Sequence, residues 1–157
     1  MDQSYKLQHF NIGPLAADSL YITGESNAID WVTIDDILAF DCIHMTFGAF
    51  LFSENDINRL LKTVVHGNSR LEYFRIALKP MNHELIISGL NAVERETTVV
   101  RQYSHEKFGT PIQFEGGTDF RCVSGDVATF KQEQPRNPNN PDEKTSFIMV
   151  AWKIKPL

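Results

Sequence analysis

Residues 33–76 read TIDDILAFDCIHMTFGAFLFSENDINRLLKTVVHGNSRLEYFRI, and this stretch decides the fold. It contains two helix starts, each of which is followed by an apolar strand. Thr33 and Ser53 each have an aspartate three residues later, Asp36 and Asp56. This is the spacing of a capping box, in which the hydroxyl and the carboxylate bind free backbone amides at a helix start. The sequence therefore predicts helices that begin after Thr33 and after Ser53.

The second of these helices has the clearest pattern in the chain. Apolar residues recur at the spacing of one helix face turned toward a core, namely Ile57, Leu60, Leu61, Val64 and Val65. Gly67 follows and is expected to end the helix in a left-handed conformation. Residues 71–76, LEYFRI, then predict a strand.

Three predicted strands share the pattern apolar-x-x-apolar-x-apolar. The matches are Ala17-x-x-Leu20-x-Ile22, Phe40-x-x-Ile43-x-Met45 and Leu71-x-x-Phe74-x-Ile76. Leu7, Phe10 and Ile12 fit the same pattern. This strand signature, with a helix between two of the strands, is typical of leucine-rich-repeat architectures, in which parallel strands stack and helices return behind them.

The C-terminal part of the chain has a β character from Pro111 onward. Ser124-Gly125-Asp126 separates two short apolar runs and predicts a hairpin, and residues 146–154 predict a further strand that pairs with it. Residues 131–145 contain three prolines and predict an exposed, mobile loop. Residues 83–103 are compatible with helix or strand. We expect one α/β domain over residues 1–157, with a leucine-rich-repeat-like βα array at 17–110 and a small antiparallel β unit at 111–157.

The composition narrows the possible partners and compartments. The net charge of −5 disfavours a sequence-independent grip on nucleic acid. Residues 42–53 form the longest uncharged apolar stretch, which is shorter than the ~20 residues of a membrane helix. The first residues lack the basic and apolar regions of a secretory signal. With two cysteines, Cys42 and Cys122, we expect free thiols and a cytoplasmic protein, with the nucleus as the alternative compartment.

Catalytic and metal-binding patterns are weak in this sequence. Cys42 and His44 could form half of a metal site or a nucleophile and its base, but zinc generally needs four ligands and a nucleophile pair needs a third orienting group. Asp35 and Asp36 are better explained as charges at a helix start than as paired acid and base. We therefore predict no catalytic residues, no cofactor and no metal.

One surface is a candidate for binding a partner protein. In a stack of parallel strands, the positions that flank the middle apolar residue point away from the helices. The six residues at these positions are Ser19, Tyr21, Cys42, His44, Tyr73 and Arg75. Stacking in order would place Tyr21, His44 and Arg75 in one row and Ser19, Cys42 and Tyr73 in the next. Tyr and Arg are frequent interface anchors. The alternative is that the C-terminal β unit covers this face, so that the residues only pack.

Several motifs together resemble a known family. They are IDWVTIDDIL at residues 29–38, SENDINRLLK at 53–62 and GNSRLEYF at 67–74, with GTDFR at 117–121 and GDVATF at 125–130. This combination resembles the type 2 F-box-associated domain of nematode F-box proteins, from about residue 17 onward. Cys122 and Ser124 depart from the family pattern, which has Arg and Asp in the closing hairpin, and residues 131–145 form a longer loop than usual.

The resemblance implies a non-catalytic domain that binds the protein substrate of a Skp1–cullin–F-box ubiquitin ligase. Residues 1–16 are too few to form the F-box that docks on Skp1, so we expect the F-box itself to be missing from this chain. The ligase link then applies only if the full gene product carries an F-box. Two other functions remain open: a free-standing binding or antagonist protein, and a small enzyme of unrecognised type. A deep polar pocket that contains His44 or His83 with a strongly shifted pKa would favour the enzyme.

Overall fold

A computed structural model describes residues 16–22, 32–49, 52–67, 69–134, 137, 139–140 and 144–153. The elements along the chain are β1 (Ala16–Ile22), α1 (Ile34–Ala39), β2 (Asp41–Ala49), α2 (Glu54–His66), β3 (Tyr73–Leu78), α3 (His83–Ile87), β4 (Ala92–His105), β5 (Phe108–Arg121), β6 (Val127–Glu133) and β7 (Thr145–Trp152). The strand expected at residues 7–12 lies outside the described residues. Of the predicted loop at 131–145, the first three residues belong to β6 and Thr145 to β7, and residues 135–136, 138 and 141–143 lie outside the described residues.

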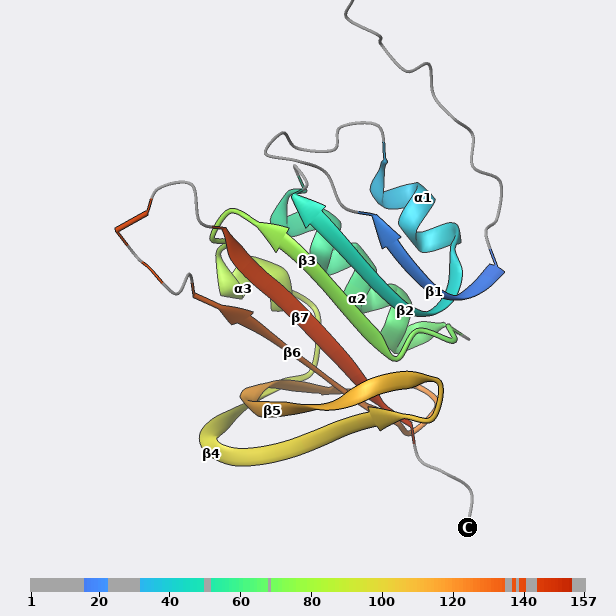
Figure 1. The fold of residues 1–157 in the computed structure, drawn as a ribbon. Coiled ribbons are helices and arrows are strands. Elements are labelled where there is room, and N and C mark those ends of the chain that lie inside the picture. The colour runs from blue at the N-terminus through green and yellow to red at the C-terminus, as the bar shows by residue number, and fades with distance from the viewer. Residues whose placement is uncertain are drawn as a thin grey trace, which may run out of the picture.

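The strands form one mixed sheet in the order β1-β2-β3-β7-β6-β5-β4. β1, β2 and β3 run parallel to one another, whereas β7, β6, β5 and β4 join by antiparallel pairing. The helices lie together on one side of this curled sheet (Figure 1). The α/β class is therefore confirmed. A leucine-rich-repeat-like array is not shown in the described part of the chain, because the parallel strands are one half of a continuous mixed sheet.

Both predicted helix starts are confirmed. Thr33 Oγ1 accepts a hydrogen bond from the Asp36 amide, and the Asp36 carboxylate accepts one from the Thr33 amide. Ser53 and Asp56 form the same reciprocal pair at the start of α2. Each pair satisfies two backbone donors that the first helical turn leaves free.

The end of α2 differs from the prediction. Gly67 has φ −98° and ψ 171°, an extended conformation rather than a left-handed one. A glycine is still favoured there, because a Cβ atom on Gly67 would lie 2.5 Å from the carbonyl oxygen of Thr63. The residue is needed for close approach and not for a positive φ.

The helix-covered face of the sheet holds the main core. Leu20, Met45 and Phe74 occupy one register position on β1, β2 and β3, and Ile22, Phe47 and Ile76 occupy another. Met45, Phe47, Phe74 and Ile76 are buried in the same cluster as Ile57 and Leu61 of α2. The apolar pattern of β2 is therefore Cys42-x-x-Met45-x-Phe47, two residues later than the predicted match that began at Phe40.

The C-terminal half contains the predicted hairpin and two pairings that the sequence did not indicate, β7 with β3 and β4 with β5. β5 and β6 meet around Arg121 and Val127, and β7 pairs with β6 as expected. β7 also pairs with β3, which places the last strand in the middle of the sheet. The antiparallel strands begin at Ala92, so the division expected at residue 110 falls within β5.

The long β4–β5 hairpin curls across the face that the helices leave free (Figure 1). Its pairing is interrupted between Arg95 and Val100, opposite Gly116 and Gly117, which have φ values of +62° and +96°. Such conformations are open to glycine and unfavourable for other residues. The bend allows a second core to form between the hairpin and the sheet, from Tyr73, Tyr103, Phe114, Ile148 and Val150.

We expect Ser53→Ala to lower the free energy of unfolding by about 1 kcal/mol, because the Asp56 amide loses its partner at the start of α2. Urea unfolding followed by circular dichroism measures this loss. Thr63→Ala on the exposed side of the same helix is the control, and its effect should stay within about 0.5 kcal/mol. Equal effects of the two substitutions would contradict a role for the cap.

Candidate functional site

The face of the parallel strands opposite α1 and α2 carries two rows of side chains. Ser19, His44 and Tyr73 share one register position, and Tyr21, Thr46 and Arg75 share another. We call these six residues the open face. The predicted rows were wrong, because they combined His44 with Tyr21 and Arg75, and Cys42 with Ser19 and Tyr73.

Cys42 does not belong to the open face. It pairs with Ala17, is 1% exposed and lies in the core that contacts the helices. The prediction misplaced it because it began the apolar pattern of β2 two residues early. Thr46 takes the missing place in the row.

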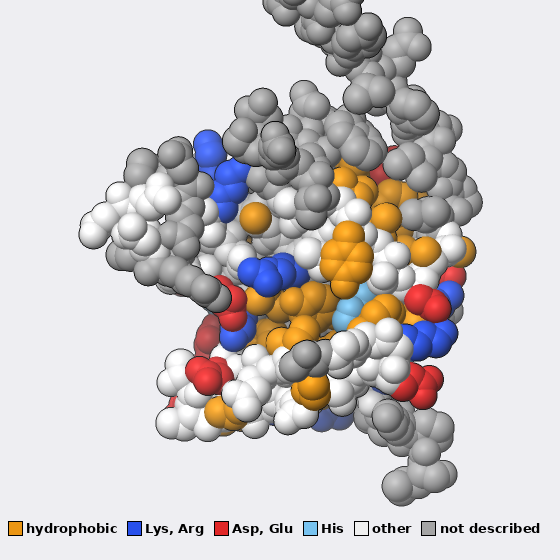
Figure 2. Space-filling view, in the orientation of Figure 1, with side chains coloured by type: hydrophobic (Ala, Val, Ile, Leu, Met, Phe, Trp, Pro, Cys, Tyr) orange, Lys and Arg blue, Asp and Glu red, His pale blue; other side chains and the backbone are white. Residues whose placement is uncertain are grey.

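A cavity of about 320 Å³ lies between the open face and the β4–β5 hairpin. The sheet contributes Tyr21, His44, Thr46, Tyr73 and Arg75 to its lining, and the hairpin contributes Tyr103, His105, Phe108 and Ile112. Figure 2 shows this side of the molecule, where hydrophobic side chains gather around a histidine with Lys and Arg beside them. We call this space the open-face cavity.

The hairpin covers part of this face and leaves part of it exposed. His44 and Tyr73 are only 6% and 7% exposed, since the hairpin packs over them. Tyr21 is 63% exposed, and Arg75 is exposed as well. The buried pair forms the floor of the cavity, and the exposed pair lies at its rim.

The floor has few free polar atoms. His44 stacks on Phe108 with 3.8 Å between ring centroids, and its Nε2 lies 2.8 Å from the Tyr103 hydroxyl. Tyr103 donates its one proton to Glu72 Oε2 at 3.2 Å, so Nε2 of His44 is the donor to Tyr103. Burial, together with the smaller effect of the nearby His105, lowers the pKa of His44 to about 4. The ring is therefore neutral near pH 7.

This lowered pKa predicts a pH dependence of stability. The unfolded chain protonates His44 near its ordinary pKa, whereas the folded chain resists protonation down to about pH 4. Its contribution is fully present above about pH 6.5 and is lost as the pH falls toward 4. Between about pH 7.5 and pH 5 we expect a loss of roughly 1 kcal/mol from this group, after allowance for solvent screening.

Urea titrations of the wild type and of His44→Gln at both pH values measure this contribution. Glutamine places an amide N–H near the position of Nε2 and does not titrate. Its stability should therefore fall less over the same interval. Parallel losses in the two proteins would show that His44 is not responsible.

Arg75 is the cation at the rim of the cavity. Its Nη2 donates to Ser146 Oγ at 3.3 Å, and no carboxylate among the described residues forms an ion pair with it. Lys107, at the tip of the hairpin, is by contrast paired with Asp18 at 3.0 Å. Arg75 thus presents a positive charge next to an apolar, aromatic cavity.

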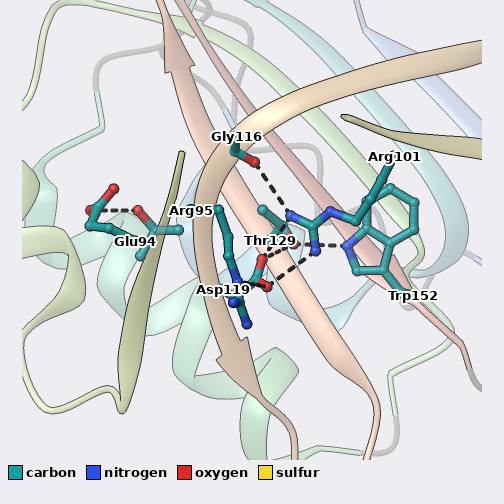
Figure 3. Close-up of polar contacts among 8 residues, drawn as sticks. Glu94, Arg95, Arg101, Gly116, Asp119, Thr129 and Trp152 are labelled. Atoms are coloured by element: carbon teal, nitrogen blue, oxygen red, sulfur yellow. Dashed lines mark hydrogen bonds and ion pairs between the residues drawn. The ribbon is translucent and has the colours of Figure 1, made fainter. Parts of the chain in front are cut away.

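A second polar cluster joins β4, β5 and β6 on the same face of the sheet as the second core, beside Trp152 (Figure 3). Asp119, 8% exposed at its side chain, accepts hydrogen bonds from Arg95, Arg101 and Thr129. Arg101 also lies over the Trp152 ring, and the Trp152 indole donates to Thr129 at 2.8 Å. Burial would raise the pKa of Asp119, but the hydrogen bonds from Arg101, Thr129 and Arg95 outweigh it and hold the pKa below its usual value.

Sequence reasoning missed the hairpin side of the cavity, because it left residues 83–103 open between helix and strand. One signal was available. Tyr103 and His105 alternate with polar residues, as do Ile112 and Phe114, which is the spacing of side chains on one face of a strand. The alternation alone does not show which face the hairpin covers.

Metal-binding clusters and membrane-spanning helices are both absent from the described residues. No group of three or more His, Cys, Asp or Glu side chains there is arranged to hold a metal ion. None of the described helices is long and apolar enough to cross a membrane. Cys42 and Cys122 are free thiols, as expected, and burial raises the pKa of both.

Comparison with known proteins identifies one family. Residues 7–76 match the model of the family described as F-box associated, a stretch that ends within β3. No curated protein and no solved structure matches the chain. The motifs at residues 117–130 lie beyond the matched segment. The resemblance that the sequence motifs indicated is thus confirmed over residues 7–76, which match the F-box-associated family of protein-interaction domains.

Proposed function

We propose that this chain binds a protein substrate at the open-face cavity, as the target-recognition part of a Skp1–cullin–F-box ubiquitin ligase in the cytoplasm or nucleus. The observation that carries the proposal is the combination of exposed Tyr21 and Arg75 with an aromatic cavity between them and the hairpin. Tyr and Arg are enriched among the residues that dominate binding energy, above all around a pocket. The family match over residues 7–76 supports a role in protein binding.

Arg75→Glu should weaken capture of the partner at least fivefold, because the substitution reverses the charge at the rim of the cavity. Its effect on the free energy of unfolding should stay within about 0.5 kcal/mol, since Arg75 is exposed and its side chain contacts the hydroxyl groups of Ser146 and Tyr73 rather than a carboxylate. Quantitative mass spectrometry of proteins captured from an extract of the source organism measures the first effect, and thermal unfolding measures the second.

Arg121→Glu is the matched control for this experiment. Arg121 is exposed at the end of β5 and does not line the open-face cavity. Its reversal should leave capture unchanged. If both variants retained the partner equally well, the proposed surface would be wrong. If Arg75→Glu melted at a much lower temperature, Arg75 would be a packing residue.

Binding of Skp1 distinguishes the ligase role from that of a free-standing binding or antagonist protein. If the full-length gene product delivers substrate to a ligase, purified Skp1 should bind it in a pull-down, and partner ubiquitylation should increase when both are present. Capture of the partner without Skp1 would favour the antagonist.

A small enzyme has one observation in its favour, which is the lowered pKa of His44 in the cavity. A general base works best when its pKa is near the operating pH, and a value of about 4 makes His44 a weak base at neutral pH. Its Nε2 also already donates to Tyr103. The arrangement fits a structural contact better than proton transfer.

A further inference from the structure

We propose that the open-face cavity takes an aromatic side chain of the partner protein that is followed or preceded by an acidic residue. This inference rests on the proposed function, since it names the chemistry that the same cavity recognises. It divides recognition between two parts of the site. The cavity holds the aromatic ring, and Arg75 binds the carboxylate.

The preference for an aromatic ring follows from the floor and walls. His44, Tyr73, Tyr103 and Phe108 present ring surfaces, and His44 lies within 3.8–5.5 Å of the other three ring centroids. The polar atoms of His44 and Tyr103 bind each other and Glu72, so they offer little to a polar guest. A volume of about 320 Å³ is at the small end for ligand sites, which suits one large side chain better than a cofactor. Offset and edge-on ring contacts would stabilise an aromatic guest.

The preference for an acidic neighbour follows from the charges at the rim. Arg75 lacks an ion-pair partner among the described residues, and no Asp or Glu lines the cavity. A cationic guest would therefore meet Arg75 without a compensating carboxylate. A carboxylate can instead form charge-assisted hydrogen bonds with the guanidinium.

The acidic group is assigned to an internal Asp or Glu and not to a chain terminus. Sites for a terminal carboxylate typically use successive free backbone N–H groups. Arg75 lies on β3, which pairs with β2 on one side and with β7 on the other. Its backbone groups are used by the sheet, so the anion partner on this strand is the side chain alone.

Capped peptides test this chemistry without knowledge of the natural partner. The test peptide is Ser-Asp-Phe-Ser, and it is compared with Ser-Asn-Phe-Ser, which lacks the charge, and with Ser-Asp-Ala-Ser, which lacks the ring. A fourth peptide, Ser-Asn-Phe with a free C-terminal carboxylate, represents a chain terminus. Titrations into the full chain are followed through the NMR signals of the Tyr73, Tyr103 and Phe108 rings.

The Asp-Phe peptide should bind about fivefold more tightly than the Asn-Phe peptide. The Asp-Ala peptide and the free terminus should bind more weakly than the Asp-Phe peptide. In Arg75→Gln the advantage of Asp over Asn should disappear, whereas Arg121→Gln should retain it. Gly109→Leu is the blocking variant, since Gly109 lines the cavity and a Cβ there meets no atom within 4 Å. It should weaken every peptide that contains phenylalanine.

Several results would overturn the inference. They are equal binding of the Asp and Asn peptides, ring signals that no peptide perturbs up to millimolar concentration, tighter binding of the free terminus, and an Asp preference that survives in Arg75→Gln.

The proposed function is contradicted by a different set of results. If Arg75→Glu does not weaken capture of the partner while the peptides bind as expected, the assigned chemistry of the cavity is retained and the partner binds elsewhere. If capture depends on Arg75 but the peptides fail, only the assigned chemistry is wrong.

Discussion

Asp119→Ala is expected to lower the free energy of unfolding by about 3 kcal/mol, because it leaves two arginines and a buried hydroxyl without their shared acceptor. Asp119 accepts from Arg95, Arg101 and Thr129, and only 8% of its side chain is exposed. Removing one partner of a buried ion pair typically costs 3–5 kcal/mol. We expect the lower end, because the Arg95 and Arg101 side chains are 47% and 25% exposed and regain water.

Urea unfolding at neutral pH measures the effect, and Asp18→Ala is the matched control. Asp18 also contacts two cations, Arg70 and Lys107, but on the exposed surface, so its loss should be much smaller. The loss of stability in Asp119→Asn should lie between those of Asp18→Ala and Asp119→Ala, since an amide oxygen still accepts hydrogen bonds but carries no charge. Similar losses for Asp18→Ala and Asp119→Ala would show that burial does not strengthen the cluster.

The same group predicts how acid acts on the fold. The folded pKa of Asp119 lies below the ordinary value, so its stabilisation is present above that value and is lost as the pH falls through the folded pKa. The contribution of His44 is lost at higher pH, between about 6.5 and 4. Asp119→Asn should therefore remove only the part of acid unfolding that occurs below the His44 interval.

Gly117→Ala is the second substitution with a large expected effect, a loss of about 3 kcal/mol in the free energy of unfolding. A Cβ on Gly117 would lie 2.8 Å from Thr129 Cγ2 and 2.9 Å from the Phe130 carbonyl oxygen. The backbone also has φ +96°, a region that side chains other than glycine rarely adopt. Strain and steric overlap should add, because β6 is paired on both sides and cannot move away freely.

Gly125→Ala separates these two causes. Gly125 has a similar φ of +92°, but nothing lies within 4 Å of a Cβ there. Its substitution should cost about 1–2 kcal/mol, from the backbone conformation alone. Chemical unfolding of both variants gives the difference, which is the cost of crowding at the bend. Equal losses would mean that the hairpin shifts to make room for the methyl group.

The elements that the sequence predicted well are those that depend on neighbours along the chain. The caps at Thr33 and Ser53 each involve residues three apart, and the amphipathic spacing of α2 repeats within one helix. The hairpin at Ser124-Gly125-Asp126 likewise needs only its own turn chemistry. Each of these features is legible in a short window, and each appears in the structure.

Only the sheet side of the candidate site could be predicted from the sequence. The hairpin side depends on contacts between strands that are far apart along the chain. Tyr21, His44, Tyr73 and Arg75 line the cavity, as an open face of parallel strands would suggest. Cys42 was misplaced because the apolar residues Phe40, Cys42 and Ile43 allow the apolar pattern of β2 to begin at either Phe40 or Cys42. The two starts differ by two residues, so the alternation of side chains between the two faces does not distinguish them. Tyr103 and Phe108 reach the site only through the bend at Gly116 and Gly117.

The two halves of the described sheet depend on one strand, β7. β7 joins β3 to β6, although some 70 residues separate it from β3 along the chain. A nascent chain on the ribosome therefore exposes the unpaired edges of β3 and β6 until β7 emerges, and such edges invite aggregation. A frameshift or nonsense codon before residue 145 should thus yield a product that is degraded as a whole. The family-matching segment would not survive as a working fragment, and even a late truncation should behave as a null allele.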